Sequence, residues 1–226
     1  MTRLPHARRG FSAGFTLIEM MTVVVLIGIV SGLGVAYLSN FKRRGNYATA
    51  IGDLQVALRI AKAEAYNRGT PVVFIVDTAG GNYYVVEDVA NGINIATTAF
   101  NPNALPSIVT VTPPVNDKMI MQGTFPSTVS FASAPPTIYA TALPAPYASL
   151  PVTTGCTFCN SSGINAGFGS ITFAIGSGAV FSNPTTPPSA GGTMTIASSG
   201  QTTVANQMIF AIVGRTGTFE TFEVLQ

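Results

Sequence analysis

The sequence predicts an α+β fold in which a long N-terminal α-helix, with a membrane half and an amphipathic half, packs on an antiparallel β-sheet domain. Residues 15–41 contain one charged side chain, that of Glu19, and about 20 apolar residues in a helix suffice to cross a bilayer. After residue 69 the chain changes to short runs rich in Val, Ile, Phe, Tyr and Thr, separated by Gly, Pro and Asn. Such runs are typical of strands.

The helix is expected to continue beyond the apolar stretch as an amphipathic segment over residues 42–68. Apolar residues recur there at three- and four-residue steps, at Ile51, Leu54, Leu58, Ala61 and Ala65. Gly69 followed by Pro71 then predicts the helix end.

Seven runs have the composition of strands, at 71–77, 83–87, 118–122, 170–175, 193–197, 207–213 and 218–224. An antiparallel sheet laid on the second half of the helix would bury its apolar stripe. Residues 89–116 and 135–154 are rich in Pro, Ala and Thr and have no steady period. They are therefore interpreted as long surface loops, available to partners.

The composition suits a protein that packs against copies of itself or works outside the cytoplasm. Only 9% of the 226 residues are charged, well below the roughly 25% of an average soluble protein. Three of the eleven basic residues precede the apolar stretch and three follow it directly at 42–44, so charge counting does not orient the segment. The rest of the chain has no basic patch.

The start of the chain combines a basic leader, Gly14-Phe15, and a glutamate four residues after Phe15, at Glu19, followed by the apolar run. This arrangement resembles the processing signature of type IV pilins and pseudopilins, and it implies a pilin-like fold. The resemblance implies cleavage by a prepilin peptidase between Gly14 and Phe15, with N-methylation of Phe15. The implied organisation is a leader at 1–14, a transmembrane and assembly helix at 15–41, an amphipathic helix at 42–68 and a β-rich domain at 69–226.

Glu19 is a charged residue in an otherwise apolar stretch, and its presence there needs a reason. A carboxylate at the centre of a bilayer costs about 2.5–3.5 kcal/mol on translocon scales, which makes it a functional candidate. If cleavage frees an amine on Phe15, that cation can pair with the Glu19 carboxylate of a neighbouring subunit and set the stagger between subunits. The alternative is that Glu19 lies near the headgroups and reaches water.

Later motifs narrow the resemblance. Residues 46–76 and the runs at 171–173, 193–196 and 209–217 look like the helix-to-strand passage and closing strands of the GspH/FimT family of minor pseudopilins. This implies a minor subunit of a type II secretion pseudopilus or a type IV pilus, between which the sequence does not choose. The implied partners are other subunits, the prepilin peptidase and an inner-membrane assembly platform, with the body in the periplasm.

Some members of that group bind DNA through a basic tail, but the corresponding tail here has Arg215 alone, followed by Glu220 and Glu223. A tail of this charge attracts phosphate weakly, which argues against a nucleic-acid partner.

Cys156 and Cys159 form a lone CxxC. No second CxxC exists and the only histidine, His6, lies in the leader, so a zinc site lacks ligands and a local disulfide is expected. Such a small ring would stiffen its loop and add little global stability.

Enzyme function has no support in the sequence. No histidine in the body can act as a base, and the acidic residues show no paired-carboxylate or metal-ligand spacing, at Asp53, Asp77, Glu87, Asp88 and Asp117. No cofactor or metal is expected. Two alternatives to the filament subunit stay open: a membrane-anchored extracytoplasmic adhesion or binding module, and a processed secreted enzyme.

Overall fold

The computed structural model describes residues 15–90, 92–95, 97–105, 107–108, 115–176, 178–182, 191–198, 207–214 and 216–224, without the side chains at 34–37, 39–40, 107–108 and 115. The leader at 1–14, including Gly14, and Arg215 lie outside the described residues. The chain divides into two compact units, Met1–Lys42 and Arg43–Gln226.

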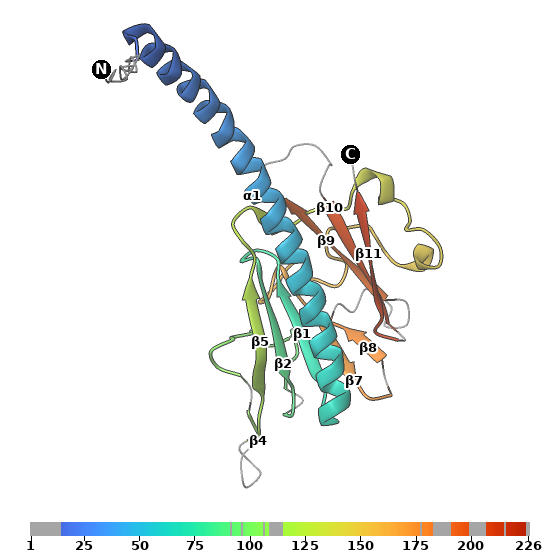
Figure 1. The fold of residues 1–226 in the computed structure, drawn as a ribbon. Helices are drawn as coiled ribbons and strands as arrows, with labels where there is room; N and C mark the ends of the chain where they lie inside the picture. Colours follow the sequence, from blue (N-terminus) through green and yellow to red (C-terminus); the bar gives the residue numbers. More distant parts are fainter. Residues whose placement is uncertain are drawn as a thin grey trace, which may run out of the picture. The chain divides into compact units, whose positions relative to one another are not determined.

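One helix, α1 (Leu17–Arg68), contributes to both units (Figure 1). In the second unit it buries the predicted stripe of Ile51, Leu54, Leu58, Ala61 and Ala65, and also three residues that were not predicted, Tyr47, Ala50 and Ala57. The predicted stop is confirmed, because Gly69 has a φ of 72° and its amide donates to the Ala65 carbonyl at 3.2 Å. Arg68 in the last turn pairs with both Glu64 and Glu87.

The strands after the helix form two main antiparallel sheets. The five-stranded sheet has the order β5 (Lys118–Thr124), β2 (Asn82–Glu87), β1 (Val72–Asp77), β7 (Phe168–Ala174), β8 (Gly178–Phe181). The four-stranded sheet has the order β11 (Phe219–Val224), β10 (Gln207–Val213), β9 (Gly191–Ser198), β6 (Val129–Phe131). A two-stranded ladder joins β3 (Ser107–Ile108) to β4 (Val115–Asn116), and two 3-10 turns lie at Thr137–Tyr139 and Tyr147–Ser149. All seven predicted strands are present, and β3, β4, β6 and β8 were not predicted.

The main core lies between the second half of α1 and the inner faces of both sheets. Leu54 and Leu58 of the helix belong to one buried cluster with Phe74 of β1 and Phe210 of β10. Figure 1 shows this part of α1 running across strands of both sheets. A single helical stripe therefore unites the two sheets.

The outer face of each sheet is covered by one of the two segments expected to be surface loops. Leu143, Leu150 and Val152 pack on Ile209 and Ala211 of β10. Ile95, only 2% exposed, packs on Val73, Ile75 and Val86 of β1 and β2. The described parts of both segments lie mostly at the surface, as expected, but each also buries apolar side chains against a sheet. Continuous apolar runs in β1 and β10 are the physical reason, because strands buried on both faces need a cover on each side.

The predicted fold class, a long half-membrane N-terminal helix packed on one antiparallel sheet, is wrong. Among the described residues no helix is both long enough and apolar enough to cross a membrane. The strands form separate five- and four-stranded sheets, and not the one sheet that was expected beside a half-membrane helix. The second sheet arises because β9 pairs with β10 and with β6, a strand of three residues, and not with β8.

Candidate functional site

The first candidate site is the start of α1, where Glu19 turns back onto Thr16. The Thr16 amide and the Thr16 hydroxyl both donate to Glu19 Oε2 at 3.0 Å, and the Glu19 amide donates to Thr16 Oγ1 at 3.3 Å. This reciprocal arrangement is a capping box, which satisfies two backbone amides that a helix start leaves without partners. Thr16 was missed in the sequence analysis, although threonine followed three residues later by glutamate is the signal for this motif.

The surface that follows the capping box is apolar on all sides. Phe15 is 79% exposed, and the large apolar side chains of the next turns are 44% to 78% exposed, at Leu17, Ile18, Met20, Met21, Val23, Val24, Val25, Leu26, Ile27, Ile29, Val30 and Leu33. A helix that is apolar all round is normally buried by other protein or by lipid. Glu19 is the only charged side chain in this surface.

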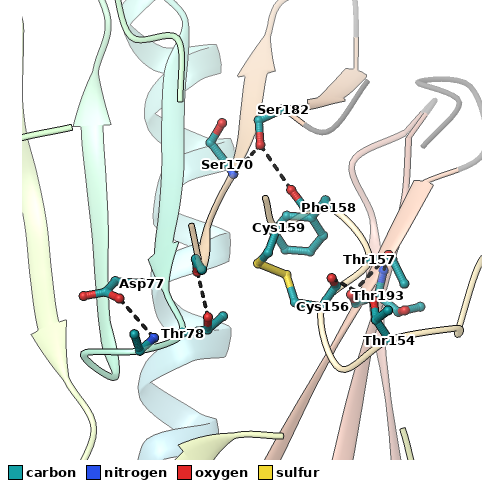
Figure 2. The surroundings of a disulfide bond; sticks show 12 residues. Asp77, Thr78, Thr154, Cys156, Thr157, Phe158, Cys159, Ser170, Ser182 and Thr193 are labelled. Atoms are coloured by element: carbon teal, nitrogen blue, oxygen red, sulfur yellow. Dashed lines mark hydrogen bonds between the residues drawn. A yellow bond between two sulfur atoms is a disulfide. The ribbon is translucent and has the colours of Figure 1, made fainter. Parts of the chain in front are cut away.

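The second candidate site is the disulfide loop, and it confirms the predicted pairing. Cys156 and Cys159 are bonded, with their Cα atoms 5.4 Å apart (Figure 2). Cys156 forms a bridge with Met194 of β9, and Cys159 forms one with Gly169 of β7. The loop is thus held by one strand from each sheet.

Hydrogen bonds and packing fix this loop from both sides. The Thr157 amide donates to the Thr193 carbonyl at 2.9 Å, and the Thr193 amide donates to Thr157 Oγ1 at 2.8 Å. Ser182 Oγ donates to the Phe158 carbonyl at 3.2 Å and accepts from the Ser170 amide at 2.9 Å; Figure 2 shows these contacts around the disulfide. The Phe158 ring is fully buried in the main core. The loop is a structural connection between the sheets.

The structure brings together two carboxylates that their spacing in sequence did not suggest. Asp88 and Asp117 are 3% and 7% exposed, and burial, followed by the neighbouring Asp88 carboxylate, raises the pKa of Asp117. The sequence shows no paired-carboxylate spacing at these positions, and the β2–β5 pairing is what puts the ends of these strands side by side. Glu87, the neighbour of Asp88, instead accepts hydrogen bonds from Arg68 and Thr70.

Among the described residues no group of three or more His, Cys, Asp or Glu side chains could hold a metal ion. The features that demand a functional explanation are the capped helix start and the apolar surface behind it. No protein-family model, curated protein or solved structure matches the chain.

Proposed function

We propose that the chain is a minor subunit of a pilus or pseudopilus, assembled with other subunits through residues 15–41. The observation that carries the proposal is the apolar surface of α1 from Leu17 to Leu33, which is exposed on every side and in which Glu19 is the one charged side chain, with Thr22 and Ser31 as the other polar ones. Exposed apolar surface of this extent marks an interaction site. The same segment of neighbouring subunits is a cover of matching chemistry and length.

In this proposal Glu19 has one role before assembly and another within the filament. In the free subunit its Oε2 atom caps the helix through Thr16, and among the described residues its Oε1 atom receives no hydrogen bond. The free amine that cleavage would create on Phe15 of a neighbour can approach Oε1. A charged pair of this kind is stable in apolar surroundings only when both partners are present.

Processing, location and partners belong to the same proposal and derive from the resemblance. A prepilin peptidase would cut between Gly14 and Phe15, and the partners would be other subunits and an assembly platform in the bacterial inner membrane, with the body in the periplasm. The finding on membrane spans gives single-pass insertion no support, so membrane fractionation of the precursor is a direct test of that part. The proposal assigns no catalysis, no cofactor and no nucleic-acid partner.

The deciding experiment is mass spectrometry of the N-terminus of the chain isolated from cells that contain a prepilin peptidase. N-methylated Phe15 as the first residue is the expected result. An intact leader would instead favour an anchored adhesion or binding module, and a cut after about residue 36 would favour a processed secreted enzyme. A peptidase-deficient strain, in which the leader should be retained, is the matched control.

A further inference from the structure

Asp88 and Asp117 lie beside the paired ends of β2 and β5, where burial of two carboxylates is unfavourable in free energy. Asp88 directly follows β2, and Asp117 lies between β4 and β5. They are 3% and 7% exposed. Two ionised carboxylates at neighbouring positions with so little water around them repel each other, and this repulsion favours the uptake of a cation by the pair.

Each carboxylate already has backbone donors on one oxygen. Asp117 Oδ1 accepts from the Ala90 amide at 2.7 Å, and Asp88 Oδ1 accepts from the Gly92 amide at 2.8 Å and the Ile93 amide at 3.4 Å. Asp117 Oδ2 is inaccessible to solvent and has no donor among the described residues. A hydrogen bond between this carboxyl and Asp88 therefore requires a proton that one of the two acids supplies.

The surrounding charges do not neutralise the pair. Glu87 on β2 lies opposite Lys118 on β5 in the strand register, and its carboxylate is engaged by Arg68 and Thr70. In the described part of the chain neither Asp88 nor Asp117 has an ion pair with lysine or arginine. Burial and the Asp88 carboxyl both raise the pKa of Asp117, while the Ala90 amide lowers it.

A proton accounts for these contacts better than a metal ion. A calcium ion takes six to eight oxygen ligands, whereas the pair leaves about one free oxygen on each carboxylate. No third acidic, histidine or cysteine side chain joins the two among the described residues. A proton needs only one oxygen from each carboxylate, and the β2–β5 register, which ends at Glu87 opposite Lys118, brings Asp88 and Asp117 to neighbouring positions.

We propose that Asp88 and Asp117 share one proton, and that this proton stabilises the packing of the segment that covers the outer face of the five-stranded sheet. The backbone amides that the two acids bind are those of Ala90, Gly92 and Ile93, at the start of that segment. Further along, Asn165 Nδ2 donates to the Ile95 and Thr98 carbonyls at 2.8 and 2.6 Å. These hydrogen bonds hold the segment where Ile95 packs against Val73 and Val86.

The proposal makes the cover sensitive to pH. When the proton leaves, two buried negative charges face each other, and the start of the segment moves away to admit water. The outer face of β1 and β2 then becomes accessible near Ile95. Because the folded pair holds its proton to a higher pH than the open segment does, closure is strongest at low pH and weakens as pH rises through the titration of the pair.

The test is hydrogen exchange by mass spectrometry on the full chain in mild detergent, from about pH 4, near the ordinary pKa of aspartate, to about pH 8. Protection of peptides that contain residues 90–95 is corrected for the intrinsic effect of pH on exchange. It should fall about tenfold for each pH unit between the open and closed pKa of the pair. Asp117→Asn, whose amide can donate to Asp88 without a proton, should keep the protection high at all pH values.

Asp77→Asn is the matched control, because Asp77 also accepts backbone hydrogen bonds, from Ala79 and Gly80 at 3.1 and 2.9 Å, but in an exposed turn. It should leave the pH dependence at residues 90–95 unchanged. Carbon-detected NMR of the aspartate carboxyls in the wild-type chain is a second readout that needs no variant: one carboxyl of the pair should titrate above the ordinary range. Protection independent of pH, ordinary titration of both acids, or protection restored at high pH by calcium chloride would each overturn the shared proton.

Discussion

Replacing Gly155 by alanine should destabilise the body strongly, because the loop between the sheets has no space for a methyl group there. A Cβ at this position would lie 1.7 Å from the Ala132 carbonyl oxygen and 2.6 Å from its carbon, both rigid backbone atoms. Residue 155 must therefore shift. Its amide would lose the 3.1 Å bond to the Ser133 carbonyl, and its carbonyl would lose the 2.6 Å bond from the Thr195 amide.

The expected loss follows from these contacts. Two backbone hydrogen bonds contribute about 0.5–1.5 kcal/mol each and overpacking costs about 1–3 kcal/mol, so the free energy of unfolding should fall by about 2–6 kcal/mol. Urea unfolding of the full chain in mild detergent can be followed by tyrosine fluorescence, since the sequence has seven tyrosines and no tryptophan.

Gly52→Ala is the matched control, because the same methyl group enters open space within α1. It should stabilise the chain by about 0.5–1 kcal/mol, as alanine favours a helix over glycine. If Gly155→Ala unfolds within about 1 kcal/mol of the wild type, the loop is not the tight connection between the sheets that its hydrogen bonds indicate.

Three further predictions concern the helix start, the disulfide and the end of α1. Glu19→Gln should reduce crosslinking between subunits about a hundredfold or more, because a buried amine loses its anion at a cost of roughly 3–5 kcal/mol. Thr16→Val should remove only the helix cap and leave crosslinking within about tenfold of wild type. Equal losses in both variants would mean that Glu19 acts only as a cap. Reduction of Cys156–Cys159 should lower the free energy of unfolding by less than about 3 kcal/mol in the same urea assay, because the ring is small. Glu87→Gln should cost about 1–3 kcal/mol at neutral pH, since it weakens a charged hydrogen bond in a nearly buried site, and an unchanged urea midpoint would contradict that.

Local patterns were sufficient to predict the parts of the fold that depend on neighbours in sequence. The stripe at Leu54 and Leu58 has the helical period, the stop at Gly69 has a backbone that glycine favours, and Cys156 can reach Cys159 within one turn of chain. Each of these features is determined within a few residues. The capping box of Thr16 and Glu19 is equally local, and its signal was present in the sequence.

Features that depend on distant pairing were missed. The strand β6 (Val129–Phe131) is too short to show a period, and its place is set by β9, more than sixty residues later. Asp88 and Asp117 meet only because β2 and β5 pair. The segments at 89–116 and 135–154 have the composition of loops, but Ile95 and Leu150 are buried because β1 and β10 each need a cover on the outer side.

The position of β11 at one edge of its sheet affects how copies of the body can meet. Two such edges pairing antiparallel about their centre would place Glu220 of one copy opposite Glu223 of the other, twice over. Like charges directly opposite each other destabilise a strand pair, and natural proteins use charged edges to prevent sheets from joining. Two bodies that approach each other at this edge would therefore not join their sheets. The chain cannot grow into a continuous β-sheet through β11, even at high concentration.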